Sequence, residues 1–308
     1  MTKPTLLITA GDPLGIGPEV TVKALNNPRV RRTCNPVLIG EPTSLYRAGF
    51  TPDLASLVAV EPLRALPAKA RPCAEAGRIS FQAVKLGIKW ALAEHLPLVT
   101  APINKQSWAL ARVPFTGHTE VLRAATNTEG LMMFVSGNLR CALVTEHFAI
   151  SDLPRVLTKN LIKMRAESFY KALQKLGIKK PKIAVCALNP HASDNGQFGT
   201  EEKKKIMPAL HALAKQGISL AGPLPCDYAW YAHANSQFDG ILCMYHDQAL
   251  TPLKLAAHEP IVHLTAGLPF IRTSPTHGTA FDIAGKNKAD EHSMVAAILQ
   301  AAFSKISV

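Results

Sequence analysis

Short apolar runs alternate with longer amphipathic segments along this chain, and that alternation limits its fold more than any other feature. The runs have the length and composition of β-strands and cover residues 5–10, 36–40, 97–101, 131–136, 141–147, 182–188, 240–245 and 261–266. The longer segments carry apolar residues at helical spacing and cover residues 78–95, 159–176, 199–216 and 293–306. Strands that alternate with helices in this way predict an α/β fold with a largely parallel sheet.

The composition is that of a globular protein. Hydrophobic residues make up 47% of the chain and charged residues 18%, and no apolar run reaches the roughly 20 residues that a membrane-spanning helix needs. The N-terminus reads as a first strand and a turn, not as a signal peptide, so we expect a cytoplasmic protein. The six cysteines form no C-x-x-C pair, and several lie inside apolar runs, which predicts reduced packing residues without disulfides.

The net charge of +12 raises the question of a nucleic-acid partner. Basic residues are spread along the chain, however, and aromatic residues, which stack on single strands, make up only 6%. A basic protein suits an anionic small substrate equally well, because a positive cleft concentrates anions. A basic scaffold for nucleic acid therefore stays a competing hypothesis, and we predict neither a nucleic-acid nor a membrane partner.

Polar residues cluster where the predicted strands end, which is where ligands bind in parallel α/β folds. His147, His191 and His246 each stand at such an end. Three imidazoles plus one open position are typical of a catalytic metal centre, although a single histidine is more often a satisfied core residue. Their spacing matches no local zinc motif, so a metal site would have to form through the tertiary fold. Asp227 and Asp247 could orient a metal-bound histidine or act as a general base.

The segment "GDPLGIGPEV" (11–20) predicts a tight turn that leads into a helix, with Pro18 in the first helical turn. Its backbone N–H groups could bind a phosphate, but it matches neither the dinucleotide fingerprint nor the P-loop. We therefore interpret it as a structural turn, with Asp12 and Glu19 as minor functional candidates.

Two other segments offer anion-binding side chains. "TGHTE" (116–120) places His118 and Thr119 where a loop enters a helix; Thr119 could cap that helix, or both residues could donate hydrogen bonds to an anionic substrate. Arg272 directly follows the apolar run "LPFI", a position that suits a bidentate grip on a carboxylate or phosphate.

Together these motifs resemble the PdxA family, the 4-hydroxythreonine-4-phosphate dehydrogenases of vitamin B6 biosynthesis. The matching segments run in family order from residue 11 to about residue 290, which is nearly the whole chain. They are "GDPLGIGPEV", "TAPINK", "GHTE", "NPHA", "GPLPCD", "MYHDQ", "GLPFIRTS" and "HGTAFDIAGK".

The resemblance implies a two-lobed fold akin to isocitrate and isopropylmalate dehydrogenases, with the active site in the cleft between the lobes. Residues 1–110 together with 255–308 would form the cofactor-binding lobe, and residues 111–254 the lobe for metal, substrate and dimerisation. The resemblance further implies a homodimer whose active site is completed by the partner subunit, and binding of NAD or NADP without the usual glycine fingerprint.

The resemblance also assigns roles to residues. His147, His191 and His246 look like ligands of one divalent ion (zinc, magnesium or cobalt), with His246 supplied by the other chain. The base would be Asp247, Asp227 or a nearby Lys. The substrate contacts would be His118, Thr119, Lys254, His263 and Arg272. The cofactor contacts would be His277, Gly278, Asp282 and Ile283.

Two positions bear on specificity. His263 stands where the family usually has Asn, which puts the substrate in question. Asp282 favours NAD over NADP, because a carboxylate that meets the ribose hydroxyls repels a 2′-phosphate.

The implied reaction is oxidation of 4-phosphohydroxy-L-threonine at its C3 hydroxyl to 2-amino-3-oxo-4-phosphooxybutanoate. This product decarboxylates to 3-amino-2-oxopropyl phosphate in pyridoxine 5′-phosphate biosynthesis. The alternative within the family is a dehydrogenase of another hydroxy acid, such as phosphorylated threonate or erythronate, or of an aromatic dihydrodiol. A phosphotransacetylase-like acyltransferase would need neither metal nor cofactor and would leave the strand-end histidines unexplained.

Overall fold

The computed structural model describes residues 3–65 and 70–304. The chain divides into two compact units. Unit 1 comprises Met1–Gly130 and Val262–Val308, and unit 2 comprises Leu131–Ile261. Within the described ranges, no helix combines the length and the apolar character needed to cross a membrane.

The predicted lobe boundaries, 110/111 and 254/255, lie earlier in the chain than the observed ones. Helix α6 (His118–Thr126) stays with unit 1 because Val121 and Leu122 are buried in the same core as helix α4 (Ala74–Glu94). The second predicted boundary would cut through helix α11 (His246–Ala256), which belongs to unit 2 as a whole.

The strands of unit 1 lie in the order β3-β2-β1-β4-β11-β10. Neighbouring strands are parallel, except that β10 is antiparallel to β11. Their bounds are β1 (Thr5–Thr9), β2 (Asn35–Gly40), β3 (Ser56–Ala59), β4 (Leu98–Thr100), β10 (Val262–Ala266) and β11 (Arg272–Pro275).

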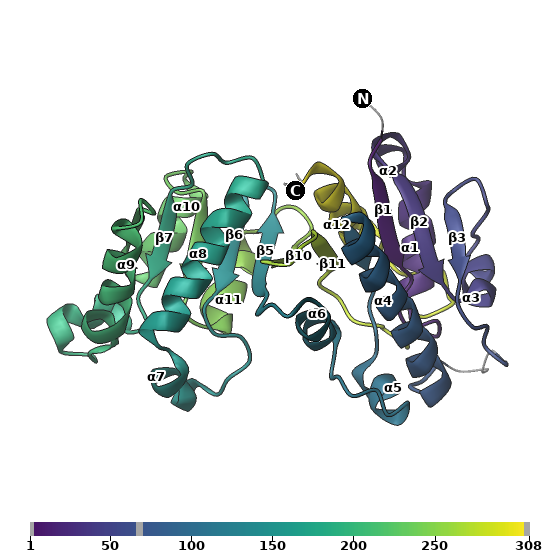
Figure 1. Cartoon of the computed structure of the whole chain (residues 1–308), viewed down its shortest axis with the longest axis horizontal. Helices are drawn as coiled ribbons and strands as arrows, with labels where there is room; N and C mark the ends of the chain where they lie inside the picture. The colour runs from purple at the N-terminus through teal and green to yellow at the C-terminus, as the bar shows by residue number, and fades with distance from the viewer. Residues whose placement is uncertain (1–2, 66–69, 305–308) are drawn as a thin grey trace. The chain divides into compact units, whose positions relative to one another are not determined.

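Helices cover both faces of this sheet, because its central strand is apolar on both sides. In β1, Leu6 and Ile8 pack into one core with α1 and α12, whereas Leu7 packs into another with α4, α5 and α6. Figure 1 shows α4 on the near side of the unit 1 strands. The remaining helices of unit 1 are α1 (Gly17–Asn26), α2 (Pro28–Thr33), α3 (Pro42–Arg47), α5 (Lys105–Leu110) and α12 (His292–Phe303).

The strands of unit 2 lie in the order β5-β6-β9-β7-β8. Strands β5 and β6 form an antiparallel pair, and the others are parallel to their neighbours. Their bounds are β5 (Leu131–Ser136), β6 (Leu139–Leu143), β7 (Ile183–Cys186), β8 (Leu220–Leu224) and β9 (Gly240–Cys243).

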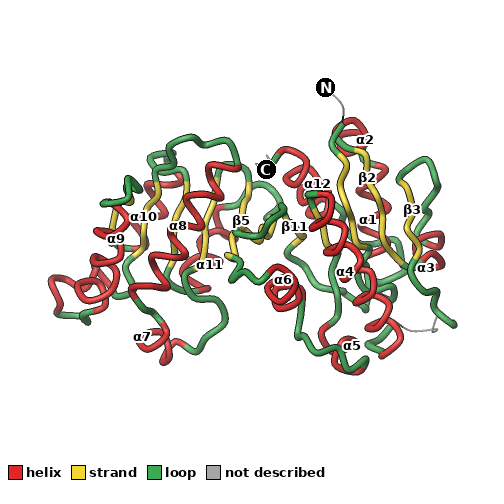
Figure 2. Tube along the Cα trace, in the orientation of Figure 1, coloured by secondary structure: helices red, strands yellow, loops and turns green. Residues whose placement is uncertain are grey.

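Helices also alternate with strands in unit 2, as the red and yellow segments of Figure 2 show. Helices α10 and α11 bury Ala229, Trp230 and Leu253 against one face of the sheet. Helix α8 lies over the opposite face, where Phe169 and Leu173 leave room for nothing larger than Gly240. The helices here are α7 (Leu153–Val156), α8 (Lys159–Lys175), α9 (Met207–Ala214), α10 (Cys226–Ala234) and α11, with short helical turns at Ile150–Asp152, Pro190–Gly196 and Glu202–Ile206.

The predicted α/β class and the largely parallel sheet are confirmed. Three strands have no counterpart in the predicted runs, namely β3, β8 and β11. Their sequences are "SLVA", "LAGPL" and "RTSP", which are too short or too rich in Gly, Pro and polar residues to give a strand signal. The predicted C-terminal helix is observed as α12, and residues 305 and 306 of that prediction lie outside the described residues.

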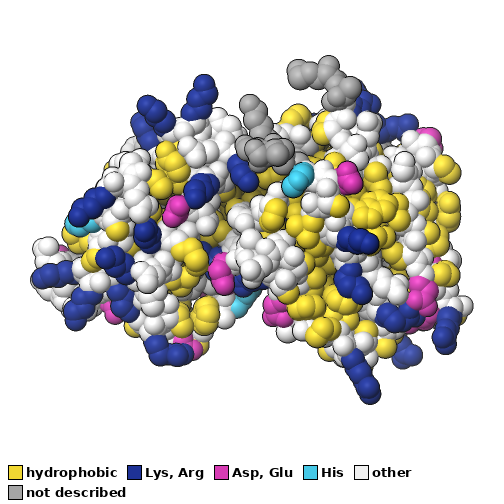
Figure 3. All heavy atoms as spheres, viewed as in Figure 1, with side chains coloured by type: hydrophobic (Ala, Val, Ile, Leu, Met, Phe, Trp, Pro, Cys, Tyr) yellow, Lys and Arg dark blue, Asp and Glu magenta, His cyan; other side chains and the backbone are white. Residues whose placement is uncertain are grey.

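The surface shows how the side chains behind the net charge of +12 are distributed. On the face shown in Figure 3, Lys and Arg side chains are scattered and Asp and Glu side chains lie among them. A nucleic-acid interface would concentrate basic side chains in a stripe or patch. The six cysteines are all free, and four of them are buried.

Candidate active site

Two of the predicted metal ligands, His147 and His246, lie side by side in unit 2. Strands β6 and β9 are parallel neighbours, and their pairing continues beyond the strand ends. The N–H of Thr145 donates to the carbonyl of Met244 (3.1 Å), and the Thr145 hydroxyl donates to the same carbonyl (2.6 Å). Each histidine follows two residues later, and the centroids of the two imidazole rings are 5.5 Å apart.

Asp247 orients one of these rings. Its carboxylate accepts a hydrogen bond from Nδ1 of His246 at 2.7 Å. This bond fixes the proton on Nδ1 and leaves Nε2 with a lone pair for an incoming ligand. Of the two roles predicted for Asp247, this geometry supports orientation of a histidine.

His191 lies in an unusual turn after β7. Five consecutive residues other than glycine, His191 to Asn195, have φ between 44° and 68°, the left-handed region that costs roughly 1–2 kcal/mol per residue. Conformations of this kind persist where the surrounding structure enforces them, commonly at functional sites. Glu202 holds the chain just before this turn, because its Oε1 accepts hydrogen bonds from the N–H groups of Leu188 (2.9 Å) and Asn189 (2.8 Å).

The structure does not bring His191 to the other two histidines as a ligand group. Its ring packs against Phe198, with the centroids 6.5 Å apart. Across residues 3–65 and 70–304, no three His, Cys, Asp or Glu side chains are arranged so that they could hold a metal ion. A single chain therefore pairs two of the three predicted ligands.

The two other predicted residues of unit 2 are exposed. Asp227 lies in the first turn of α10, and its carboxylate accepts the N–H of Tyr228 at 2.9 Å. Lys254 lies in the last turn of α11. Both side chains are accessible to a ligand.

Unit 1 contains a buried cation. Arg272 is 2% exposed, and its Nη2 donates to the hydroxyl of Thr100 (2.6 Å). Its Nη1 donates to the hydroxyl of Thr265 and to Nδ1 of His263, both at 3.2 Å, while its Nε is buried without an acceptor. Burial lowers the pKa of Arg272 to about 9, which still leaves it cationic at neutral pH.

None of the ion pairs found within the described part of the chain neutralises Arg272. The partners of its side chain are two threonine hydroxyls and an imidazole nitrogen, and none of them is an anion. A buried charge of this kind is costly unless it is paired. The arrangement therefore favours an anion, and the fork of the guanidinium matches a carboxylate or a phosphate.

His118 belongs to the same neighbourhood. Burial lowers its pKa well below the usual histidine value, and the charges of Arg272 and His263 act in the same direction. Its ring packs edge-on against Trp108, and its Nε2 is buried without a hydrogen-bond partner. A neutral imidazole with an unused nitrogen can donate a hydrogen bond to an anion or accept one from a hydroxyl.

Thr119 does not cap α6. The helix begins at His118, and the residue before it, Gly117, takes the cap position in extended conformation. The capping role considered for Thr119 is therefore wrong, and its hydroxyl lies in the first turn of the helix.

The four predicted cofactor residues lie in the segment between β11 and α12. Gly278 has open space where a Cβ would stand, and Asp282 is exposed. The segment is fixed to the glycine-rich loop after β1, because the N–H of Ile16 donates to the carbonyl of Thr279 (2.9 Å) and a Cβ on Gly15 would lie 2.9 Å from that of Thr279. The two sequence motifs are thus in direct contact within unit 1.

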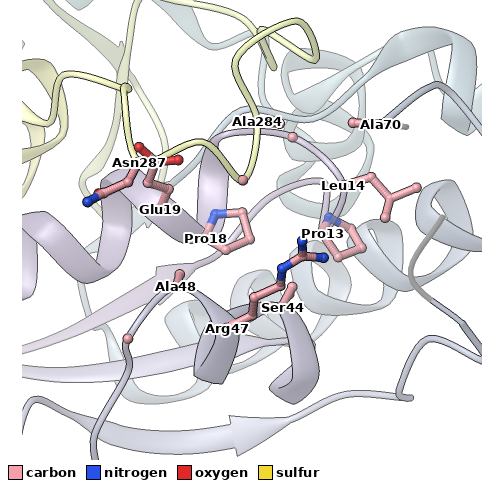
Figure 4. Close-up of a pocket in the computed structure, with 13 residues that line it drawn as sticks. Pro13, Leu14, Pro18, Glu19, Ser44, Arg47, Ala48, Ala70, Ala284 and Asn287 are labelled. Atoms are coloured by element: carbon pink, nitrogen blue, oxygen red, sulfur yellow. The ribbon is translucent and has the colours of Figure 1, made fainter. Parts of the chain in front are cut away.

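Beside this contact is a cavity of about 380 Å³ (Figure 4). None of the four predicted cofactor residues lines it, although the adjacent Ala284 and Gly285 do. Arg47 and Ser44 of α3 also line it, and Figure 4 shows Arg47 extending towards Pro13. Sequence reasoning missed Arg47 and Ser44, because α3 is a short helix without a recognisable motif.

The minor candidates Asp12 and Glu19 are structural in part. Oδ1 of Asp12 accepts the N–H of Leu14 (3.0 Å), and Oε1 of Glu19 accepts the N–H of Ala289 (2.8 Å) and Nζ of Lys23 (2.9 Å). Burial raises the pKa of Asp12, and its hydrogen bonds only partly offset that effect. These contacts support the structural interpretation of the glycine-rich turn.

Comparison with known proteins finds one family and its dehydrogenases. The family described as pyridoxal phosphate biosynthetic protein PdxA matches residues 28–301. The D-threonate 4-phosphate dehydrogenase of Cupriavidus necator is 39% identical, with 97% of this chain and 96% of that protein aligned. The 4-hydroxythreonine-4-phosphate dehydrogenase of Geobacter metallireducens is 36% identical over 98% and 95% of the two chains.

A solved structure agrees with these sequences. The crystal structure of a 4-hydroxythreonine-4-phosphate dehydrogenase from Burkholderia phymatum superposes with a TM-score of 0.83, at 36% identity and 98% coverage of each chain. The family match, the relatives and the superposed structure thus all cover the part of the chain that contains the paired histidines and the buried arginine. This chain belongs to the PdxA family.

Proposed function

We propose that the protein is a metal-dependent dehydrogenase that oxidises the C3 hydroxyl of a four-carbon, 4-phosphorylated 3-hydroxy acid with NAD or NADP. The observation that carries the proposal is the presence of two complementary groups of residues in one chain of this family. Unit 2 offers paired imidazoles, one oriented by a carboxylate. Unit 1 offers a buried guanidinium that has no anionic partner among the described residues.

The donor set suits a divalent ion. Imidazole nitrogens are good ligands for zinc and cobalt, and His147 and His246 present two of them together. His191 would be the third ligand. Since His147 and His246 pair within one chain, the sharing of the site between subunits that the resemblance implies would then involve His191. When bound, the ion would polarise the substrate oxygen and lower the pKa of its hydroxyl.

Residues of the chain itself would bind the substrate, accept its proton and bind the cofactor. Arg272 and His118 would hold the phosphate or carboxylate of the substrate, with Thr119, His263 and Lys254 as further contacts. Asp227 or Asp247 would accept the hydroxyl proton while hydride leaves C3 for the nicotinamide. The β-keto acid so formed then loses CO2. His277, Gly278, Asp282 and Ile283 would bind the adenosine part of the cofactor, and exposed Asp282 would favour NAD.

The substrate we place first is 4-phosphohydroxy-L-threonine, in pyridoxine phosphate biosynthesis. Phosphorylated threonate is a second candidate, because the D-threonate 4-phosphate dehydrogenase of Cupriavidus necator is as similar to this chain, at 39% identity, as the 4-hydroxythreonine-4-phosphate dehydrogenase of a Synechococcus strain. The two compounds share the carboxylate, the C3 hydroxyl and the C4 phosphate, and differ in carrying an amino group or a hydroxyl at C2. We further propose a homodimer, and a cytoplasmic location that suits the free cysteines.

The decisive experiment measures NADH or NADPH formation from both compounds. Metal-stripped protein is assayed alone and after addition of zinc, magnesium or cobalt, beside His246→Ala and a control, His211→Ala, on the exposed surface of α9. We expect turnover that requires a metal, is lost in His246→Ala and is kept in His211→Ala.

The outcomes separate the parts of the proposal. The better of the two compounds by kcat/KM identifies the substrate. Full activity of the metal-stripped protein, or of His246→Ala, would overturn the metal site. Failure to oxidise either compound with any of the metals would overturn the substrate class.

A further inference from the structure

Gln248 follows His246 and Asp247 in the motif "MYHDQ", and none of the roles above uses it. It is 6% exposed and is the third residue of α11. A glutamine at this position of a helix commonly turns back to accept an N–H that precedes the helix. Here Oε1 of Gln248 accepts the N–H of Met244 at 2.7 Å. The bond fixes the segment that links β9 to His246.

The other end of the same amide reaches a different strand. Nε2 of Gln248 donates to the carbonyl of Ala187 at 2.7 Å. Ala187 directly follows β7 and precedes the left-handed turn that begins near His191; its own N–H donates to Leu224 of β8 (2.8 Å). One side chain therefore ties the segment before His246 to the segment before His191.

The third histidine segment is linked through Met244. The carbonyl of Met244 accepts both the N–H and the hydroxyl of Thr145, two residues before His147. Gln248 accepts the N–H of Met244 and Thr145 donates to the carbonyl of Met244. Hydrogen bonds therefore fix the backbone of Met244 on both of its peptide groups. All three segments that carry a predicted metal ligand thus meet at this amide.

The backbone of Gln248 adds a fourth connection. In a regular helix its carbonyl would accept the N–H of residue 252, but that residue is Pro252 and has none. The carbonyl instead accepts Nε1 of Trp230 at 3.0 Å. Trp230 lies in α10 with Asp227, so the helix of the candidate base is attached to the same residue.

We propose that Gln248 is the positioning residue of the metal site: it sets the relative placement of the segments that carry His147, His191 and His246 without touching metal or substrate. This inference rests on the proposed function for the identity of the ligands. Outer residues that orient ligands in this way typically change metal affinity about 10- to 100-fold when they are replaced.

The test uses two variants that cut different bonds. Gln248→Met keeps the length of the side chain and loses both bonds. Gln248→Glu keeps an oxygen for the N–H of Met244 and sets a second oxygen against the carbonyl of Ala187. Ile162→Ala, at a fully buried position of α8, is the control for a general loss of stability.

Two readouts are taken on the full-length protein. Hydrogen–deuterium exchange reports on segments 144–147, 187–195 and 244–247, and Co²⁺ titration followed by its visible absorption reports affinity and ligand geometry. We expect Gln248→Met to exchange faster in all three segments, and Gln248→Glu only in 187–195. We expect both to bind Co²⁺ about 10- to 100-fold more weakly with a changed spectrum, while Ile162→Ala keeps affinity and spectrum.

Exchange that is unchanged in these segments, or that rises equally in Ile162→Ala, would overturn the proposal. So would faster exchange accompanied by wild-type Co²⁺ affinity and spectrum. If wild-type protein binds no Co²⁺ but the segment-specific exchange appears, Gln248 is the positioning residue of these loops and the metal part of the proposed function is wrong.

Discussion

Arg272 buries a positive charge, which costs stability unless another group compensates it. Its guanidinium is buried among two hydroxyls and an imidazole, none of them an anion. The charge has lost most of its hydration, and no ion pair with a described residue compensates it. A second buried arginine, Arg165 in α8, differs in having Glu146 at 3.8 Å. The two positions therefore allow the effect of the missing counter-ion to be measured.

The first prediction concerns these two arginines. Arg272→Met should leave the thermal unfolding temperature unchanged or raise it, because it removes a buried charge that has no carboxylate partner. Arg165→Met should lower the free energy of unfolding by about 0.5–3 kcal/mol, because it removes the guanidinium that lies 3.8 Å from the Glu146 carboxylate. Calorimetry of both variants checks this, and a large loss of stability in Arg272→Met would contradict it.

The second prediction concerns the function of Arg272. Arg272→Lys keeps the charge but loses the planar fork, so charge-assisted bonds of about 1.5–3 kcal/mol are lost towards the substrate. We expect kcat/KM to fall about 10- to 150-fold. Steady-state kinetics with the better substrate measure this; wild-type kcat/KM would show that Arg272 does not contact the substrate anion.

At the scale of elements, short-range polar contacts fix the helix ends around the site. The buried carboxylate of Glu41 caps α3, which lines the cavity in unit 1. It accepts the N–H groups of Thr43 (2.9 Å), Ser44 (2.6 Å) and Leu63 (3.2 Å). Burial alone would raise its pKa, but these hydrogen bonds outweigh burial and lower the pKa from its ordinary value of 4.5.

The third prediction is a pH dependence of this cap. Because the folded state depresses the pKa of Glu41, its contribution is fully present above pH 4.5 and is lost as pH falls through the folded pKa. Glu41→Gln should cost about 1–3 kcal/mol at pH 7, and the difference from wild type should shrink below pH 4.5. Urea unfolding across pH, with exposed Glu94→Gln as the control, tests this; a constant difference would contradict it.

A glycine sets the packing of α4 on α5. A Cβ at Gly77 would lie 2.0 Å from the carbonyl oxygen of Ser107. Glycine inside a helix normally costs about 1 kcal/mol relative to alanine, so helix propensity alone favours Gly77→Ala. The steric conflict with a backbone atom opposes it.

The fourth prediction is that the steric conflict with Ser107 outweighs the gain in helix propensity. Gly77→Ala should destabilise the protein by about 1–3 kcal/mol, because α4 and α5 must separate. Lys89→Ala, on the exposed face of the same helix, should change stability by no more than about 0.5 kcal/mol. Equilibrium unfolding measures both, and a stabilised Gly77→Ala would show that propensity dominates.

At the scale of the whole molecule, the candidate residues fall into two compact units. Unit 1 carries the residues proposed to bind the anion and the cofactor, and unit 2 carries His147, His191 and His246 together with Lys254. In the homodimer proposed above, the partner subunit would supply one of the three metal ligands.

The fifth prediction tests this sharing. His191→Ala and His246→Ala should each be inactive alone. If the two histidines of one site come from different subunits, a dimer that contains one of each variant has one intact site, and random mixing should restore about a quarter of wild-type activity. The two variants are co-expressed or refolded together, and the activity of the mixture is measured. If no activity is recovered, all three ligands come from one subunit.

Several features were predictable from the local pattern. The α/β class followed from the alternation of runs, and the placement of His147, His191 and His246 beyond parallel strands followed from where those runs end. Other features were not. Strand β11 has the sequence "RTSP", which carries no apolar pattern. It is buried all the same, because neighbouring elements cover it.

The sequence by itself determined most of the elements, the family and the residue types at the strand ends, because these depend on periodicity and on motifs that are local in the chain. Only the tertiary structure decided which of those residues meet. The strand order put β9 between β6 and β7, which paired His246 with His147 and placed Gln248 among three histidine segments. It also left Arg272 without a counter-ion, because burial and hydrogen bonding are set by residues distant in sequence.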